Sequence, residues 1–124
     1  MPEQPITTTY TSKSDQETKK IGQNFGMKLK SGLLCLRGPL GAGKTTFIRG
    51  LAKGLKIKSR IVSPTFTYQR IHKGNIALYH FDYYRISKPD ALLAVELHEA
   101  LECPKSVVAI EWPENMEKYL PLKR

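Results

Sequence analysis

The chain has 124 residues, which is enough for one domain and too few for two. Hydrophobic residues make up 40% of it, and no stretch approaches the length of a transmembrane helix, which argues against a membrane protein. The formal net charge of +9 favours polyanionic partners, such as an RNA or an acidic protein surface. A basic surface that is simply solvated explains the charge equally well.

The beginning of the chain and the cysteines favour a cytoplasmic protein. Residues 1–10 are polar and lack the apolar segment of a signal peptide. Cys35 and Cys103 lie far apart in the sequence, at no spacing typical of a metal or redox site. We expect both thiols to be reduced and structural, as is usual in the cytosol.

The N-terminal part contains patterns for a strand and a helix. Residues 6–10 are rich in β-branched side chains and are expected to form a strand. A capping box begins at Ser14, and apolar residues then recur at every fourth position, which predicts a helix over residues 15–30. Gly22 and Gly26 weaken that prediction.

Strand and helix patterns then alternate along the rest of the chain. Apolar or alternating runs predict strands over residues 33–37, 76–81 and 107–110. Apolar stripes predict helices over residues 45–55 and 89–101. This alternation is typical of an α/β fold with a parallel sheet.

A glycine-rich loop lies between the strand over residues 33–37 and the helix over residues 45–55. Residues 38–45 match G-x-x-x-x-G-K-T in full. Such glycines let the backbone curl around phosphates with no Cβ in the way, and the N–H groups that open the next helix attract anions. Lys44 would place its charge on the β- and γ-phosphates, and Thr45 would offer its hydroxyl to Mg²⁺.

The loop therefore predicts a nucleotide site and a fold. We expect ATP and Mg²⁺ to be bound in a P-loop NTPase-like α/β fold of three layers, in which helices flank a mainly parallel sheet. We expect a single P-loop ATPase domain over residues 1–124. The candidate nucleotide-binding residues in and after the loop are Gly38, Leu40, Gly41, Ala42, Gly43, Lys44, Thr45 and Thr46.

Two acidic residues are candidates for the metal site and for catalysis. Glu111 follows the buried strand over residues 107–110 and would hold Mg²⁺ or its water. Asp82 follows the strand over residues 76–81, where it would orient the attacking water or join the metal shell, or else only cap a turn. The sequence leaves open which carboxylate lies nearer the metal.

Four other residues carry weaker signals. Thr65 belongs to the Ser-Pro-Thr-Phe-Thr stretch over residues 63–67, where P-loop switches often sense the γ-phosphate and where a plain turn is the alternative. Trp112 would pack near the nucleotide or against the core. His80 is expected to be a packed histidine, whereas Arg85 would either stabilise phosphate charge or pair with a carboxylate.

Four motifs occur in order along the chain: Gly-Pro-Leu-Gly-Ala-Gly-Lys-Thr-Thr over residues 38–46, Ser63-Pro64-Thr65-Phe66-Thr67, His80-Phe81-Asp82-Tyr83-Tyr84-Arg85 and Glu111-Trp112-Pro113-Glu114. In this order and spacing they resemble the TsaE family, the small ATPases of bacterial tRNA threonylcarbamoyladenosine synthesis. The resemblance covers nearly the whole chain, up to Glu114.

The resemblance implies an accessory ATPase. Such a protein hydrolyses ATP slowly by itself and acts in a complex with TsaD and TsaB. Within that complex, TsaD transfers a threonylcarbamoyl group to the tRNA adenosine beside the anticodon. Any contact with tRNA would be made through that complex. The implied roles are phosphate binding by Lys44, metal binding by Thr45 and Glu111, hydrolysis by Asp82, a switch at Thr65 and a place beside the nucleotide for Trp112.

The chain departs from the usual pattern of that family in three respects. Pro39 stands where an acidic residue usually follows the first loop glycine. The basic charge is higher than is usual, and the chain ends at Arg124 where family members usually run on. We therefore expect a domain that is shortened at its C-terminus.

Two other functions remain open from the sequence. A small-molecule kinase would use the same loop, but the length leaves little room for a lid and an acceptor pocket. A nucleotide-binding module without turnover is the second alternative, and the presence of Asp82 and Glu111 argues against it. A guanine-specific switch is disfavoured because no Asn-Lys-x-Asp sequence follows the last strands.

Overall fold

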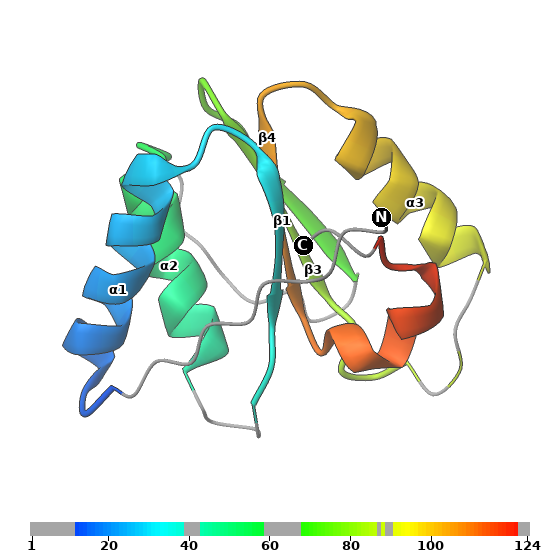
Figure 1. Ribbon diagram of the computed structural model, residues 1–124, viewed down its shortest axis with the longest axis horizontal. Coiled ribbons are helices and arrows are strands. Elements are labelled where there is room, and N and C mark those ends of the chain that lie inside the picture. The colour runs from blue at the N-terminus through cyan, green and yellow to red at the C-terminus, as the bar shows by residue number, and fades with distance from the viewer. Residues whose placement is uncertain (1–11, 39–42, 59–67, 87, 89–90, 122–124) are drawn as a thin grey trace, which may run out of the picture.

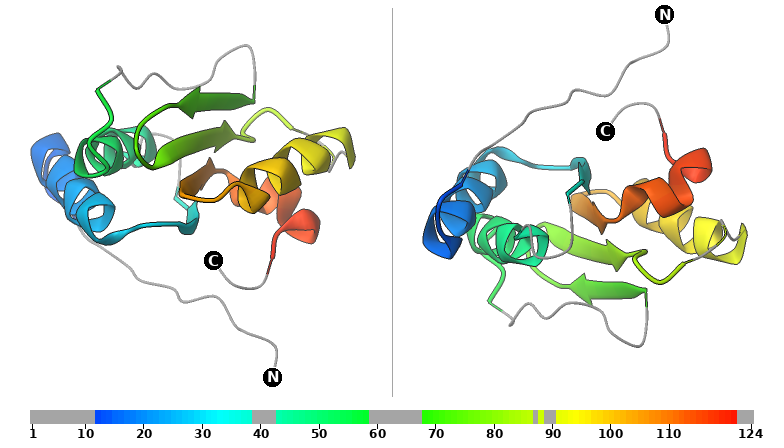
Figure 2. Two further views of the ribbon diagram at one scale, coloured as in Figure 1. Left: turned by 90° about the horizontal axis from the view of Figure 1, so that it is seen from above. Right: turned by 90° about the horizontal axis from the view of Figure 1, so that it is seen from below.

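The computed structural model describes residues 12–38, 43–58, 68–86, 88 and 91–121. Figure 1 shows a sheet with helices on both sides, and the two views of Figure 2 show the same three layers. None of the helices in these ranges is long and apolar enough to cross a bilayer. The elements in chain order are α1 (Asp15–Lys28), β1 (Gly32–Leu36), α2 (Lys44–Gly54), β2 (Gln69–His72), β3 (Ala77–Asp82), α3 (Ala91–Glu102), β4 (Ser106–Glu111) and the 3₁₀ helix η1 (Pro113–Tyr119).

The sheet is mixed and mostly parallel, as the sequence predicts. Its strand order is β1-β4-β3-β2, and β4 is parallel to both β1 and β3. The strand β2 was not predicted, and it runs antiparallel to β3 at the edge of the sheet. Its four residues, Gln-Arg-Ile-His, are too short and too polar to give a strand signal, so the pairing with β3 decides their conformation.

The other predicted elements are present with boundaries shifted by one or two residues. α1 ends at Lys28 instead of residue 30, and the Ser14 side chain caps its start by accepting a hydrogen bond from the Glu17 N–H at 3.1 Å. The short helix η1 was not predicted. The strand predicted over residues 6–10 lies outside the described residues.

The sheet divides the core into two apolar layers. α1 and α2 cover one face, where Ile48 and Leu51 pack with strand residues such as Leu78 and Val107. α3 and η1 cover the other face. All six residues of β4 are buried, which agrees with the buried strand predicted there. The apolar run of β1 predicted a strand buried on both faces, but β1 lies at the end of the strand order and only Leu33 in it is buried.

Glycines bring α1 and α2 unusually close together. Each helix carries two glycines four residues apart, and the two helices run in the same direction (Figure 1). The glycines of α1 weakened the prediction of that helix, whereas the structure shows that they make room for α2. An added Cβ would overlap a carbonyl oxygen of the facing helix at all four positions: Gly22 on Phe47, Gly26 on Leu51, Gly50 on Lys19 and Gly54 on Gln23.

Candidate nucleotide-binding site

The ends of three strands and the start of α2 lie at one edge of the sheet. Leu36, Glu111 and Asp82 are paired side by side at the carboxyl ends of β1, β4 and β3. α2 begins at Lys44, directly after the glycine loop. In open α/β sheets, ligands bind outside the carboxyl ends of the strands, so this edge is the place to look for a site.

Gly43 turns the chain into α2. Its φ of 91° and ψ of 19° are left-handed, a conformation that a residue with a Cβ rarely adopts. This turn makes Lys44 and Thr45 the first two residues of the helix. N–H groups at a helix start have no partner within the helix and favour an anion, which suits the phosphate-binding role predicted for the loop.

Thr45 and Glu111 are joined by hydrogen bonds. The Thr45 hydroxyl lies 3.0 Å from Oε1 and 3.1 Å from Oε2 of Glu111. Glu111 is only 4% exposed, so its carboxylate depends on such donors in place of water. The sequence placed both residues in the metal site, and the structure brings them together.

Glu111 has a second partner that the sequence did not predict. Nε2 of His80 lies 2.7 Å from Oε2 of Glu111, and the His80 side chain is fully buried. The expectation of a packed histidine is correct about burial but missed this hydrogen bond. The available signal was the alternation in β3, which places His80 on the same face as Asp82.

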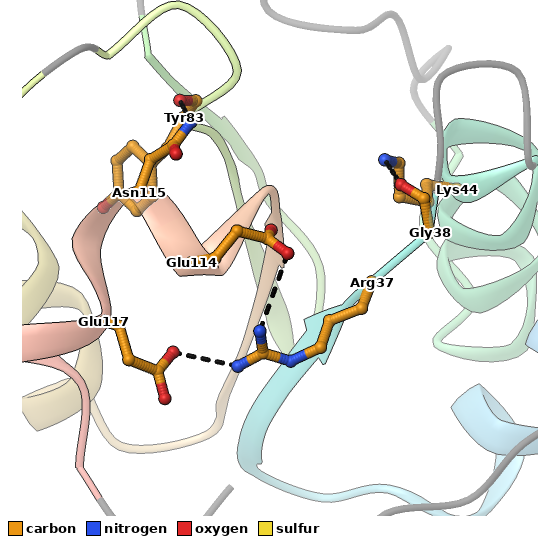
Figure 3. Close-up of polar contacts among 7 residues, drawn as sticks. All are labelled: Arg37, Gly38, Lys44, Tyr83, Glu114, Asn115 and Glu117. Carbon is orange, nitrogen blue, oxygen red and sulfur yellow. Dashed lines mark hydrogen bonds and ion pairs between the residues drawn. The ribbon is translucent and has the colours of Figure 1, made fainter.

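Lys44 is held inside the site by two contacts. Its Nζ donates a hydrogen bond of 2.6 Å to the carbonyl oxygen of Gly38 (Figure 3). The same Nζ lies 3.6 Å from the centre of the Trp112 ring. The residue is 9% exposed. A cation this close to a tryptophan face is stabilised by the ring quadrupole, which places Trp112 at the predicted phosphate-binding lysine.

Trp112 has an unusual backbone conformation at the end of β4. Its φ of 58° and ψ of 52° are left-handed, which costs a bulky residue about 1–2 kcal/mol. Contacts on the side chain offset this: the Tyr84 ring lies 5.0 Å away, centre to centre, and Lys44 lies on the ring. The turn directs the chain from β4 into η1.

The helix η1 is tied to the site from two sides. Nδ2 of Asn115 donates to the carbonyl oxygen of Tyr83 at 2.8 Å, which fixes the chain after β3 (Figure 3). Arg37, just before the glycine loop, lies 2.9 Å from Glu117 and 3.6 Å from Glu114. The hydrogen bond to Glu117 raises the pKa of Arg37, but the pair is half exposed and contributes little stability.

Asp82 lies beside Glu111 in the sheet and also caps a turn. Its Oδ1 accepts a hydrogen bond of 3.0 Å from the N–H of Tyr84, which is the turn role considered from the sequence. The Cα register pairs Asp82 with Glu111. Both carboxylates therefore belong to one edge, and Asp82 is the less buried of the two.

The remaining predicted site residues contribute less to this picture. Thr46 is half-buried on α2, and Arg85 is exposed. Four predicted nucleotide-binding residues lie outside the described part of the chain: Leu40, Gly41, Ala42 and Thr65.

The described residues fit Mg²⁺ only together with a nucleotide. They contain no cluster of three histidine, cysteine or acidic side chains that would bind a metal by themselves. Mg²⁺ commonly takes one or two protein oxygens and completes its shell with phosphates and water. A buried Glu111 carboxylate hydrogen-bonded to the Thr45 hydroxyl is a suitable donor set for that arrangement.

The family model of the threonylcarbamoyl adenosine biosynthesis protein TsaE matches residues 12–124. The chain belongs to the TsaE family. A TsaE protein of Nostoc sp. is 45% identical over 105 residues, which cover 82% of this chain and 65% of the relative. A TsaE protein of Treponema pallidum is 39% identical over 111 residues. The match covers 89% of this chain and 82% of that relative.

A solved structure shares the α/β fold of this chain. The crystal structure of Bacillus subtilus YdiB superposes with a TM-score of 0.73 at 33% sequence identity. The match covers 89% of this chain and 67% of YdiB. The chain therefore spans about two thirds of YdiB and of the Nostoc TsaE protein.

Proposed function

We propose that this chain binds and slowly hydrolyses ATP with Mg²⁺, and that it supports the threonylcarbamoyl modification of the tRNA adenosine beside the anticodon. The observation that carries the proposal is the hydrogen-bonded pair of Thr45, at the start of α2, and the buried Glu111, at the end of β4. Membership of the TsaE family supplies the pathway, since the Nostoc and Treponema relatives are named as tRNA threonylcarbamoyladenosine biosynthesis proteins.

The residues of the site have separate tasks in this proposal. Lys44 exchanges Gly38 and Trp112 for the β- and γ-phosphates, because an ammonium group binds phosphate more strongly than it binds a carbonyl oxygen or a ring. Thr45 and Glu111 would hold Mg²⁺, which when bound would supply positive charge to the phosphates. Asp82 orients the attacking water from the neighbouring strand.

The proposed protein partners are TsaD and TsaB, and tRNA is reached through that complex in the cytoplasm. Charge separation within the chain supports a polyanionic partner, because residues 18–81 contain no aspartate or glutamate. Within this range, Lys19, Lys20, Lys28 and Lys53 are exposed on α1 and α2. We propose that the chain acts as one P-loop ATPase domain.

The direct test is phosphate release from Mg-ATP by the wild type and by Lys44→Ala, with and without the matching TsaD–TsaB pair. We expect slow release by the wild type alone, faster release with the partners, and at least a tenfold loss in Lys44→Ala, because the substitution removes the positive charge proposed to bind the β- and γ-phosphates. An exposed lysine outside the site, Lys73→Ala, is the matched control and should behave like the wild type.

The same assay separates the alternatives. Release that is indifferent to the partners would contradict the accessory role. Consumption of ATP only with a small-molecule acceptor would indicate a kinase. Nucleotide binding without release under any of these conditions would indicate a binding module.

A further inference from the structure

We infer that His80 is a positioning residue that holds the Glu111 carboxylate in place for Mg²⁺, an inference that rests on the proposed function. His80 lies in the middle of β3, with Ala109 beside it on β4 and Arg70 beside it on β2. Glu111 is two residues further along β4 on the same face of the sheet. The 2.7 Å hydrogen bond therefore runs diagonally across two parallel strands.

The bond has a defined direction. An ionised carboxylate only accepts hydrogen bonds, so Nε2 of His80 is the donor. The other ring nitrogen, Nδ1, is buried and has no hydrogen-bond partner in the described part of the chain. The hydrogen on Nε2 therefore points at Glu111, and Nδ1 makes no hydrogen bond to any described residue.

Packing alone does not explain a histidine at this position. His80 is fully buried, and its neighbours on this face include Leu78 and Ala109. An apolar side chain would fill such a place without the desolvation of two ring nitrogens. The hydrogen bond to Glu111 is the one feature of the described surroundings that requires a donor here.

The consequence concerns the metal. Thr45 offers a single hydroxyl hydrogen to two carboxylate oxygens that lie at nearly equal distances, so it does not by itself fix the rotation of the carboxylate. His80 engages Oε2 only, which selects one orientation. The partner that orients a metal-binding side chain usually changes metal affinity or activity about 10–100-fold when it is removed.

The test compares two substitutions of equal polarity. In His80→Gln the amide nitrogen reaches about as far as Nε2, whereas in His80→Asn it stops near the position of Nδ1. His80→Phe removes the donor and keeps a ring, and His98→Phe is the control, since His98 is an exposed histidine on α3 away from the site. Each variant is measured for melting temperature, for ADP affinity in EDTA and in Mg²⁺, and for kcat and KM with Mg-ATP.

The deciding quantity is the factor by which Mg²⁺ increases the affinity for ADP over that in EDTA. We expect this factor to stay within about threefold of the wild type in His80→Gln and to fall about tenfold or more in His80→Asn. ADP affinity in EDTA should be unchanged in both, and the loss in turnover should fall on kcat. Equal behaviour of the Asn and Gln variants, or effects limited to the melting temperature, would overturn the positioning role. A wild type without any Mg²⁺-dependent nucleotide binding would instead overturn the proposed function, and the inference with it.

Discussion

Replacing Gly50 with alanine is expected to destabilise the protein by about 1–3 kcal/mol, the typical range of an overpacked core position. In an ordinary helix the same change stabilises by about 0.5–1 kcal/mol, because alanine is the better helix former. Here the added Cβ would overlap the backbone of Lys19, and a backbone carbonyl cannot move aside as a side chain can. Helix propensity alone predicts that the substitution raises the free energy of unfolding, whereas we expect it to lower that free energy.

Urea denaturation of Gly50→Ala and of Asn24→Ala would measure this. Asn24 is exposed on α1, so its replacement changes helix propensity without touching α2 and should be neutral or slightly stabilising. If Gly50→Ala were as stable as the wild type, the two helices could separate at little cost. The close packing of α1 and α2 would then contribute little to the free energy of unfolding. Because α2 carries Lys44 and Thr45, nucleotide affinity should fall together with stability.

Replacing Glu111 with glutamine is expected to lower kcat for ATP hydrolysis about 10²-fold, the scale of losing one electrostatic contact to the reacting charge. Glutamine keeps the size of the side chain, and its carbonyl oxygen can still accept from His80 or Thr45. The change removes the negative charge proposed to attract Mg²⁺, and we expect the fold to be retained. Steady-state phosphate release over a range of Mg²⁺ concentrations would show both a lower kcat and a higher Mg²⁺ requirement.

The matched control is Glu102→Gln, at an exposed position on α3 away from the site. It should match the wild type in kcat and in Mg²⁺ requirement. If Glu111→Gln retained full turnover, Glu111 would be a structural acid at a strand end, and Asp82 would become the candidate metal ligand.

Local patterns were sufficient to predict the elements that surround the site. The apolar run before Glu111 predicted β4, and the glycine loop predicted the order of strand, loop and helix around Lys44. From these, the meeting of Thr45 and Glu111 follows, because parallel strands bring their carboxyl ends to one edge. The structure confirms the mainly parallel sheet and shows Thr45 hydrogen-bonded to Glu111.

Features that depend on tertiary contacts could not be predicted in the same way. β2 is too polar to be recognised without its pairing to β3. Gly50 has the local character of a helix-weakening residue, and only the proximity of α1 explains it. The contacts of His80 with Glu111 and of Lys44 with Trp112 join residues far apart in the sequence, so no local pattern contains them.

The measurement that tests the central claim most directly is a calorimetric titration of the wild type and Lys44→Ala with a non-hydrolysable ATP analogue in Mg²⁺. If Lys44, Thr45 and Glu111 form the ATP site, the wild type will bind one nucleotide per chain, and Lys44→Ala will bind at least about tenfold more weakly, a difference of about 1.4 kcal/mol. The emission of Trp112, the only tryptophan, should change in step with binding as Lys44 leaves its ring. No saturable binding, or equal affinity in the two proteins, would contradict the account.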